Sequence, residues 1–173
     1  MNNVRFVPAA LDLAYEEVDQ NVEKFEREFN VISESEENSI TQGIKHVKMR
    51  GETDETNLLM LNILSELYRK MDKIEQLLVH GNPKRLALAC EGYIESIGLE
   101  HFKLTENILE PGKHYYGRLE LTTFPKREIA FYFEGVEPSV AKIEKIHVRD
   151  KEAWGYFMTA CERIMIRQLK GNE

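Results

Sequence analysis

Residues 114–136, HYYGRLELTTFPKREIAFYFEGV, carry the clearest structural signal in the chain. On either side of the sequence FPKRE (124–128), aromatic and aliphatic residues alternate with polar ones. A period of two residues places one face of a strand in a core and the other in solvent, and a proline-containing break between two such runs is typical of a turn. The stretch therefore predicts two antiparallel strands.

The same period continues on both sides of this hairpin. Further strand-like runs are RLALAC (85–90), YIESI (93–97), EHFKL (100–104) and VAKIEKIHV (140–148), and EPGK (110–113) is a turn sequence. Asp150 is a suitable N-cap for a last helix at 151–169, which ends before Gly171. One apolar stripe on that helix could close the end of a small barrel: Trp154, Phe157, Met158, Cys161, Ile164 or Met165, and Leu169. Residues 83–173 are therefore predicted to form an α+β domain, a small antiparallel barrel of five or six strands with a C-terminal helix.

Residues 1–82 show a helical period instead. A first helix is predicted at about 8–29 and a second at about 55–79, with a polar linker between them. Apolar residues on both helices recur at alternating steps of three and four, which is the heptad pattern of helices that associate. The predicted seam consists of Leu11, Tyr15, Val18, Val22, Phe25 and Phe29 in the first helix, and of Met60, Leu64, Leu67, Met71, Ile74 and Leu78 in the second.

The second helix is apolar on more than one side. Leu58, Leu59, Leu61 and Ile63 lie beside its seam, and a bundle of several helices would bury them better than a two-stranded coiled coil. We therefore expect residues 1–82 to form an oligomerisation region, with a homotetramer favoured and a dimer of hairpins open. The alternative is that both helices pack within the chain on the following domain.

Composition limits the classes of function. The chain has 173 residues, 30 acidic against 23 basic side chains and a formal net charge of −7, which argues against nucleic-acid binding. The sequence shows neither a signal-peptide pattern nor an apolar run of membrane-spanning length, and Cys90 and Cys161 are expected to be free thiols. We expect a cytoplasmic protein without a membrane or nucleic-acid partner.

The sequence contains none of the common catalytic or metal-binding motifs. The five histidines lack the spacing of zinc ligands, and the isolated glycines do not form a phosphate-binding loop. We therefore expect neither an enzyme nor a cofactor or metal. An enzyme whose active site is dispersed around His101, His114 or His147 remains an alternative.

The C-terminal 90 residues resemble a PilZ domain. The resemblance lies in the order and spacing of YIESIGLEHF (93–102), ILEPGKHYYGRLEL (108–121), REIAFYFEGV (127–136) and the segment from IHV (146–148) into the last helix. It implies a barrel of the PilZ type in bacterial cyclic di-GMP signalling, associated with motility, attachment or biofilm. The heptad helices before the domain are similar to those of PilZ proteins that oligomerise through added helices.

The resemblance also implies where cyclic di-GMP would bind. PilZ domains bind it through R-x-x-x-R before the first strand and D/N-x-S-x-x-G on the next hairpin. In this chain the first motif is reduced to Lys84 and Arg85, and the second falls on Tyr93, Glu95 and Gly98, of which only the glycine matches. A carboxylate facing a phosphate is repulsive.

The chain is therefore expected to be an oligomeric, non-enzymatic adaptor that binds an unidentified signalling protein and does not bind cyclic di-GMP. A cyclic di-GMP receptor that uses Lys84 and Arg85 in a divergent site is the main alternative.

Overall fold

The chain divides into a barrel unit and a helical unit. A computed structural model describes residues 5–19, 21–34, 54–80, 85–122 and 126–171, without the side chains of residues 55, 56, 76, 77, 79 and 80. The barrel unit comprises Met1–Ser33 and Leu86–Glu173, and the helical unit comprises Glu34–Arg85. The helical unit is thus inserted into the sequence of the barrel unit, and the barrel begins near the N-terminus rather than at residue 83.

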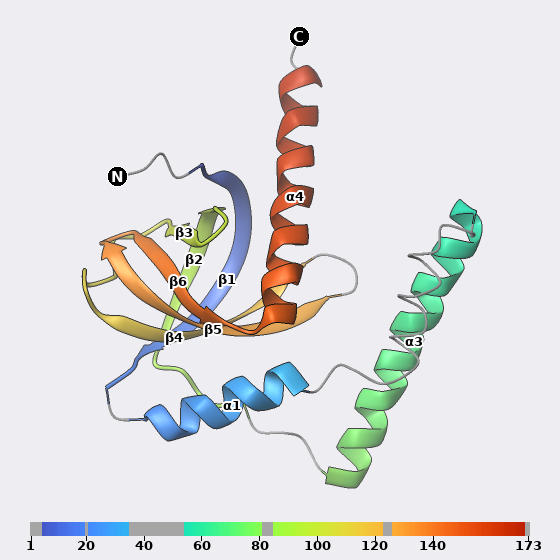
Figure 1. The fold of residues 1–173 in the computed structure, drawn as a ribbon, viewed down its shortest axis with the longest axis horizontal. Coiled ribbons are helices and arrows are strands. Elements are labelled where there is room, and N and C mark those ends of the chain that lie inside the picture. The colour runs from blue at the N-terminus through green and yellow to red at the C-terminus, as the bar shows by residue number, and fades with distance from the viewer. Residues whose placement is uncertain (1–4, 20, 35–53, 81–84, 123–125, 172–173) are drawn as a thin grey trace. The chain divides into compact units, whose positions relative to one another are not determined.

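The barrel is closed and antiparallel, with the strand order β1-β2-β3-β6-β5-β4 (Figure 1). Its strands are β1 (Val7–Glu17), β2 (Cys90–Ile97), β3 (His101–Leu104), β4 (His114–Leu121), β5 (Arg127–Glu137) and β6 (Val140–Ile146). The hairpin expected from residues 114–136 is β4 paired with β5, in an unbroken register from His114 opposite Glu134 to Leu121 opposite Arg127. The prediction of a small antiparallel barrel followed by a helix is confirmed.

The helix predicted at 8–29 is wrong, because residues 7–17 are strand β1. Leu11, Leu13 and Tyr15 point into the barrel and are buried in its core, while the residues between them are more exposed. The seam residues Leu11 and Tyr15 are four apart, a spacing that puts two side chains on one face of a strand as well as of a helix. A register shift between Pro8 and Leu11 also interrupts the two-residue period at the start of the strand.

β1 supplies the strand that closes the barrel. It pairs with β2 on one side and with β4 on the other. The run RLALAC was expected to be a strand, but residues 85–89 lie outside the sheet and β2 begins at Cys90. The two leucines of that run, Leu86 and Leu88, pack instead on the outside of the barrel.

Helix α1 (Val22–Glu34) covers part of the outer wall of the barrel. Phe25, Phe29 and Ile32 are buried there against Tyr116 and Ala130. Two predicted seam residues, Phe25 and Phe29, therefore belong to the barrel unit's own packing. Of the other two, Val18 precedes α1 and is partly buried in the same cluster, whereas Val22 is the half-exposed first residue of the helix.

The helical unit contains α3 (Glu55–His80), which matches the helix predicted at 55–79. The Asp54 carboxylate accepts a hydrogen bond from the backbone N–H of Asn57 at 3.0 Å, so Asp54 is the N-cap. Residues 35–53, the predicted polar linker, lie outside the described residues.

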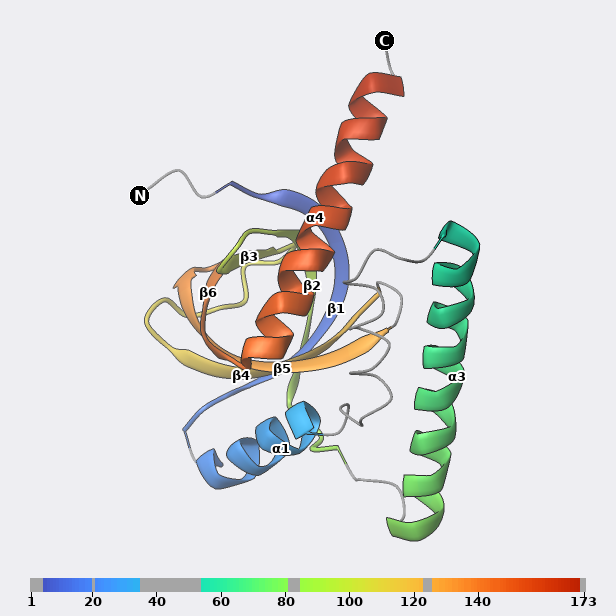
Figure 2. The ribbon, with the colours of Figure 1, turned by 45° about the vertical axis from the view of Figure 1, so that its right-hand side comes forward.

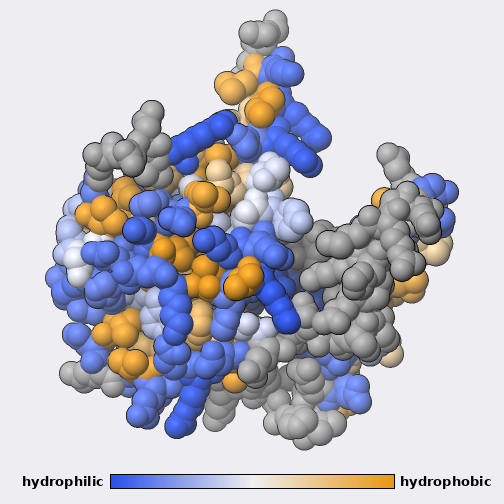
Figure 3. Space-filling view, in the orientation of Figure 1, coloured by the Kyte–Doolittle hydropathy of each residue, from blue (hydrophilic) through white to orange (hydrophobic). Residues whose placement is uncertain are grey.

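Helix α4 (Val148–Gly171) begins earlier than predicted and extends beyond the barrel (Figures 1 and 2). Trp154 and Phe157 are buried in the barrel core, and Met158 and Cys161 pack against it. The later part of the same stripe, Ile164 and Leu169, is exposed, and hydrophobic side chains are visible at the projecting end of the helix (Figure 3). The predicted stripe therefore contacts the barrel only along its first half.

Asp150 is not the N-cap of this helix. It lies in the first turn of α4, is 1% exposed, and forms an ion pair with Arg127 at the start of β5. The Nη2 and Nε atoms of Arg127 lie 2.7 and 2.8 Å from Oδ1 of Asp150. This buried ion pair fixes the beginning of α4 to the barrel wall.

Candidate functional site

The β2–β3 turn, where the PilZ resemblance places a ligand motif, is held in place by the last helix. The backbone N–H of Gly98 donates to the carbonyl oxygen of His101 at 2.7 Å. The carbonyl oxygen of Gly98 accepts a hydrogen bond from the indole Nε1–H of Trp154 at 3.0 Å. Gly98 is buried, so this turn connects the sheet to α4.

The other two positions of that motif lie on the surface of β2. Tyr93 is 46% exposed. Glu95 forms a partly exposed ion pair with Lys103 on β3, with the Nζ and Oε1 atoms 2.8 Å apart. Glu95 therefore presents a carboxylate, and not a small hydrogen-bonding group, beside the position where the motif would bind a phosphate.

The basic residues expected to form the first motif are not in the position that the resemblance requires. Lys84 lies outside the described residues, and Arg85 precedes β2, which is the second strand of the barrel. Because the first strand begins at Val7, the corresponding segment is the N-terminal one, where Arg5 forms an ion pair with Glu162 of α4. Positions 1 and 9, four residues on either side of Arg5, are not arginines.

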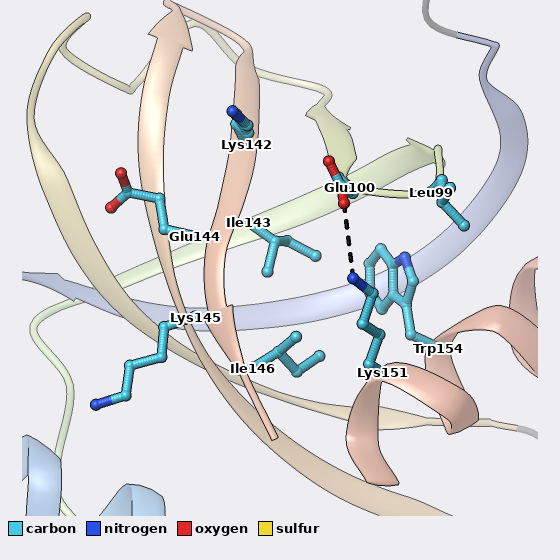
Figure 4. A pocket seen from close by; sticks show the side chains of 9 residues that line it. All are labelled: Leu99, Glu100, Lys142, Ile143, Glu144, Lys145, Ile146, Lys151 and Trp154. Carbon is cyan, nitrogen blue, oxygen red and sulfur yellow. Dashed lines mark ion pairs between the residues drawn. The ribbon is translucent and has the colours of Figure 1, made fainter. Parts of the chain in front are cut away.

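A groove of about 530 Å³ lies beside the β2–β3 turn (Figure 4). It is lined by Leu99, Glu100, Lys142, Ile143, Glu144, Lys145, Ile146, Lys151 and Trp154. The residues come from the turn, from β6 and from the first turns of α4. In the close view, Ile143 and Ile146 point toward the indole ring of Trp154, whereas Glu144 and Lys145 extend away from it (Figure 4).

Two of the three lysines that line this groove already have carboxylate partners, and Glu144 lies beside His114. Lys151 lies 3.6 Å from Glu100, Glu144 lies 2.8 Å from His114, and Lys145 lies 2.7 Å from Glu26. An anionic ligand would have to compete with these carboxylates for the lysines. The groove is thus better suited to an apolar side chain than to a phosphate.

A second group of polar residues, on the outer wall of the barrel, was not predicted from the sequence. Glu28 of α1 is 7% exposed and accepts hydrogen bonds from the Tyr116 hydroxyl at 3.1 Å and from the Leu86 backbone N–H at 2.7 Å. It also forms an ion pair with Arg118, which in turn donates to the carbonyl oxygen of Leu86 at 3.2 Å. We call Glu28, Tyr116, Leu86 and Arg118 the Glu28 cluster.

The Glu28 cluster connects α1 to Leu86, the first residue of the barrel unit after the helical unit. Burial and the nearby Glu28 carboxylate raise the pKa of Tyr116, so its hydroxyl stays protonated and can donate. The sequence contained only a weak signal for this cluster, a glutamate within the apolar stripe Phe25, Phe29 and Ile32 of α1.

The seam predicted on α3 is exposed to solvent. Its exposed fractions run from 52% at Leu64 to 81% at Leu78. The other seam residues, Met60, Leu67, Met71 and Ile74, fall between these values, and the neighbouring Leu59 and Ile63 are exposed to a similar degree. This helix face has the largest concentration of exposed large apolar side chains in the described part of the chain.

The described histidines do not converge on one place. His114 pairs with Glu144, His147 packs on Phe29 of α1, and His101 lies on β3, where burial lowers its pKa. Among the residues that the structure describes, no group of three or more His, Cys, Asp or Glu side chains could hold a metal ion. Within the same residues, no helix has both the length and the apolarity that a membrane crossing requires.

Comparison with known proteins assigns no relative to the chain: no protein-family model matches it, and no curated protein or solved structure shows significant similarity.

Proposed function

We propose that the protein is a non-enzymatic adaptor that self-associates through α3 and uses its barrel to bind a signalling protein. The observation that carries this proposal is the exposed seam of α3. Its residues follow the alternating steps of three and four that allow helices to pack side by side. A face of this kind usually marks an interaction site when it is left in water.

The partner for this face is a second copy of α3. A heptad seam is self-complementary, because the same positions of an identical helix fill the spaces between its own side chains. Exposed apolar residues such as Leu59 and Ile63 beside the seam widen the contact, which favours a tetramer over a dimer. Several barrels on one bundle would raise the avidity for a multimeric partner.

We further propose that the barrel is an atypical PilZ domain in a cytoplasmic, cyclic di-GMP-associated pathway of a bacterium. The order of the elements supports this, because the glycine turn, the Pro-Gly turn, the long hairpin and the final helix follow one another as the resemblance requires. We also propose that the barrel does not bind cyclic di-GMP, since Glu95 and Tyr93 occupy the positions of small polar groups in the ligand motif.

Self-association is tested by light scattering on the full chain, whose mass is 20.2 kDa. The variant Leu64→Gln/Leu67→Gln/Ile74→Gln places three polar side chains on the seam and is expected to be monomeric. The matched control, Lys73→Gln/Glu75→Gln, changes exposed polar residues outside the seam and is expected to keep the mass of the wild type. An unchanged mass in the triple variant would refute the role of α3.

Ligand binding is tested by calorimetric titration of cyclic di-GMP into the full chain at physiological salt. We expect no binding in the micromolar range. Binding at micromolar or lower concentration would contradict the adaptor proposal in favour of a receptor. Loss of that binding in Lys84→Glu/Arg85→Glu would then assign it to the divergent site.

A further inference from the structure

The outer wall of the barrel at β4 and β5 binds α1 in a packing cluster of its own. Phe25, Phe29 and Ile32 of α1 pack there with Tyr116 and Ala130, and none of these five residues belongs to the core inside the barrel. The strands of the barrel are hydrogen-bonded to one another around the whole closed sheet. The closed sheet and its internal core therefore do not depend on α1.

Aromatic stacking provides the first set of contacts in this site. The ring of Phe25 stacks on that of Tyr116 with the centroids 4.8 Å apart, and the ring of Phe29 stacks on that of His147 with the centroids 3.9 Å apart. Phe29 also meets the ring of Tyr132 edge to face at 5.4 Å. The two phenylalanines are four residues apart and thus lie on one face of α1.

Charge complementarity provides the second set. Arg118 of β4 pairs with Glu28 of α1, and Lys145 of β6, the strand that adjoins β5, pairs with Glu26. The ammonium group of Lys145 lies 2.7 Å from Glu26 and 5.0 Å from the centre of the Phe29 ring, so it contacts both kinds of side chain. The site thus matches a helix that carries carboxylates between its aromatic residues.

The helical structure of α1 depends on its packing against this wall more than the fold of the barrel depends on α1. The helix has 13 residues, a length at which an isolated helix is marginal in water. Val22 and Val31 are about half exposed, whereas Phe25, Phe29 and Ile32 are buried, so the wall contacts only one face of the helix. Release of α1 would uncover Tyr116 and would leave the interior core of the barrel in place.

We propose that this wall is a docking site for an acidic amphipathic helix, that α1 fills the site in the free protein, and that a helix of similar chemistry from the partner protein replaces α1. The recognised helix carries aromatic residues at positions i and i+4, carboxylates at i+1 and i+3, and an aliphatic residue at i+7, as Phe25, Phe29, Glu26, Glu28 and Ile32 do. The inference rests on the proposed role of the barrel as a protein-binding module, and it does not require self-association.

The test uses a fluorescent peptide of residues 22–34, VEKFEREFNVISE, as the probe. The full-length variant Phe25→Ala/Phe29→Ala weakens its own α1 and makes the wall available. In fluorescence anisotropy, we expect the peptide to bind this variant at least about tenfold more tightly than it binds the wild type, in which α1 competes. Trp154, buried in the separate interior core, reports whether the variant is folded.

Charge reversal identifies the bound surface. Lys145→Glu in the double-alanine background should weaken peptide binding by about tenfold or more, and a Glu26→Lys peptide should restore it. Lys145 is 52% exposed, so this change does not compromise the core. The proposal would be overturned if the peptide bound the folded double variant no more tightly than the wild type, or did not bind it detectably. It would also be overturned if the mass of the double variant increased without peptide, because α1 would then be exchanged between copies. If the wild type is monomeric and the peptide binds the double variant as expected, only the self-association would be refuted.

Discussion

Removal of Arg127 tests how the barrel holds its last helix. In Arg127→Met the side chain keeps much of its volume but loses its charge, so the carboxylate of Asp150 is left without this partner. Asp150 is 1% exposed, and both contacts from Arg127 reach the same oxygen, Oδ1. The other oxygen, Oδ2, is buried without a hydrogen-bond partner. Deleting one member of such a buried pair lowers the free energy of unfolding by about 3–5 kcal/mol, and we expect a decrease of that size for Arg127→Met at pH 7.

The loss should depend on pH with a definite sign. Burial raises the pKa of Asp150, and Arg127 opposes this effect. A carboxyl group whose pKa is higher in the folded state stabilises the fold below its ordinary value of 3.8, and that stabilisation is lost as the pH rises through the raised pKa. Without Arg127 the pKa rises further, so the difference between variant and wild type should shrink as the pH falls.

The assay is urea unfolding at several pH values, followed by circular dichroism and by Trp154 fluorescence. Two controls define the mechanism. Lys126→Met removes the neighbouring exposed pair with Glu120, whose Nζ and Oε1 atoms are 3.2 Å apart, and should cost less than about 1 kcal/mol. Adding Asp150→Asn to Arg127→Met should recover part of the loss. A loss below about 1 kcal/mol for Arg127→Met, or one that does not change with pH, would refute this reasoning.

Three further substitutions test contacts of single residues, each by urea unfolding followed by circular dichroism. Gly135→Ala should destabilise the protein by about 1–3 kcal/mol, because its Cβ would lie 2.6 Å from the backbone oxygen of Glu110; a neutral result would contradict this packing. Gly155→Ala lies in α4, where the new Cβ would meet nothing within 4 Å apart from the adjacent residues and backbone of its own helix, and it should stabilise the protein by about 0.5–1 kcal/mol. A destabilising effect would contradict this open environment. Trp154→Phe removes the hydrogen bond to Gly98 and should cost about 2–3 kcal/mol, and a loss under about 1 kcal/mol would exclude an anchoring role.

The parts of the fold that could be predicted have short-range signals. The β4–β5 hairpin combines a two-residue period with a proline-containing turn, and α3 combines a helical period with the cap at Asp54. Strand β1 was missed because Leu11 and Tyr15 fit both periods, so local pattern alone could not choose between strand and helix. Residues 7–17 form a strand because they pair with β2 and β4, which are distant in the sequence.

The candidate surfaces were predictable to different degrees. The apolar face of α3 lies within one helix, so it could be predicted from the spacing of its residues alone. The Glu28 cluster joins residues that are 90 positions apart, and only the folded barrel brings Glu28 to Arg118. The groove beside the β2–β3 turn likewise depends on Trp154 of α4, and the sequence around Gly98 does not reveal it.

The mass of the full-length wild type in solution tests the central claim most directly. Multi-angle light scattering across a range of concentrations, at physiological salt, compares it with the chain mass of 20.2 kDa. Self-association through the exposed seam of α3 predicts a stable multiple of that mass, with four copies favoured. A mass of one chain at every concentration would contradict it.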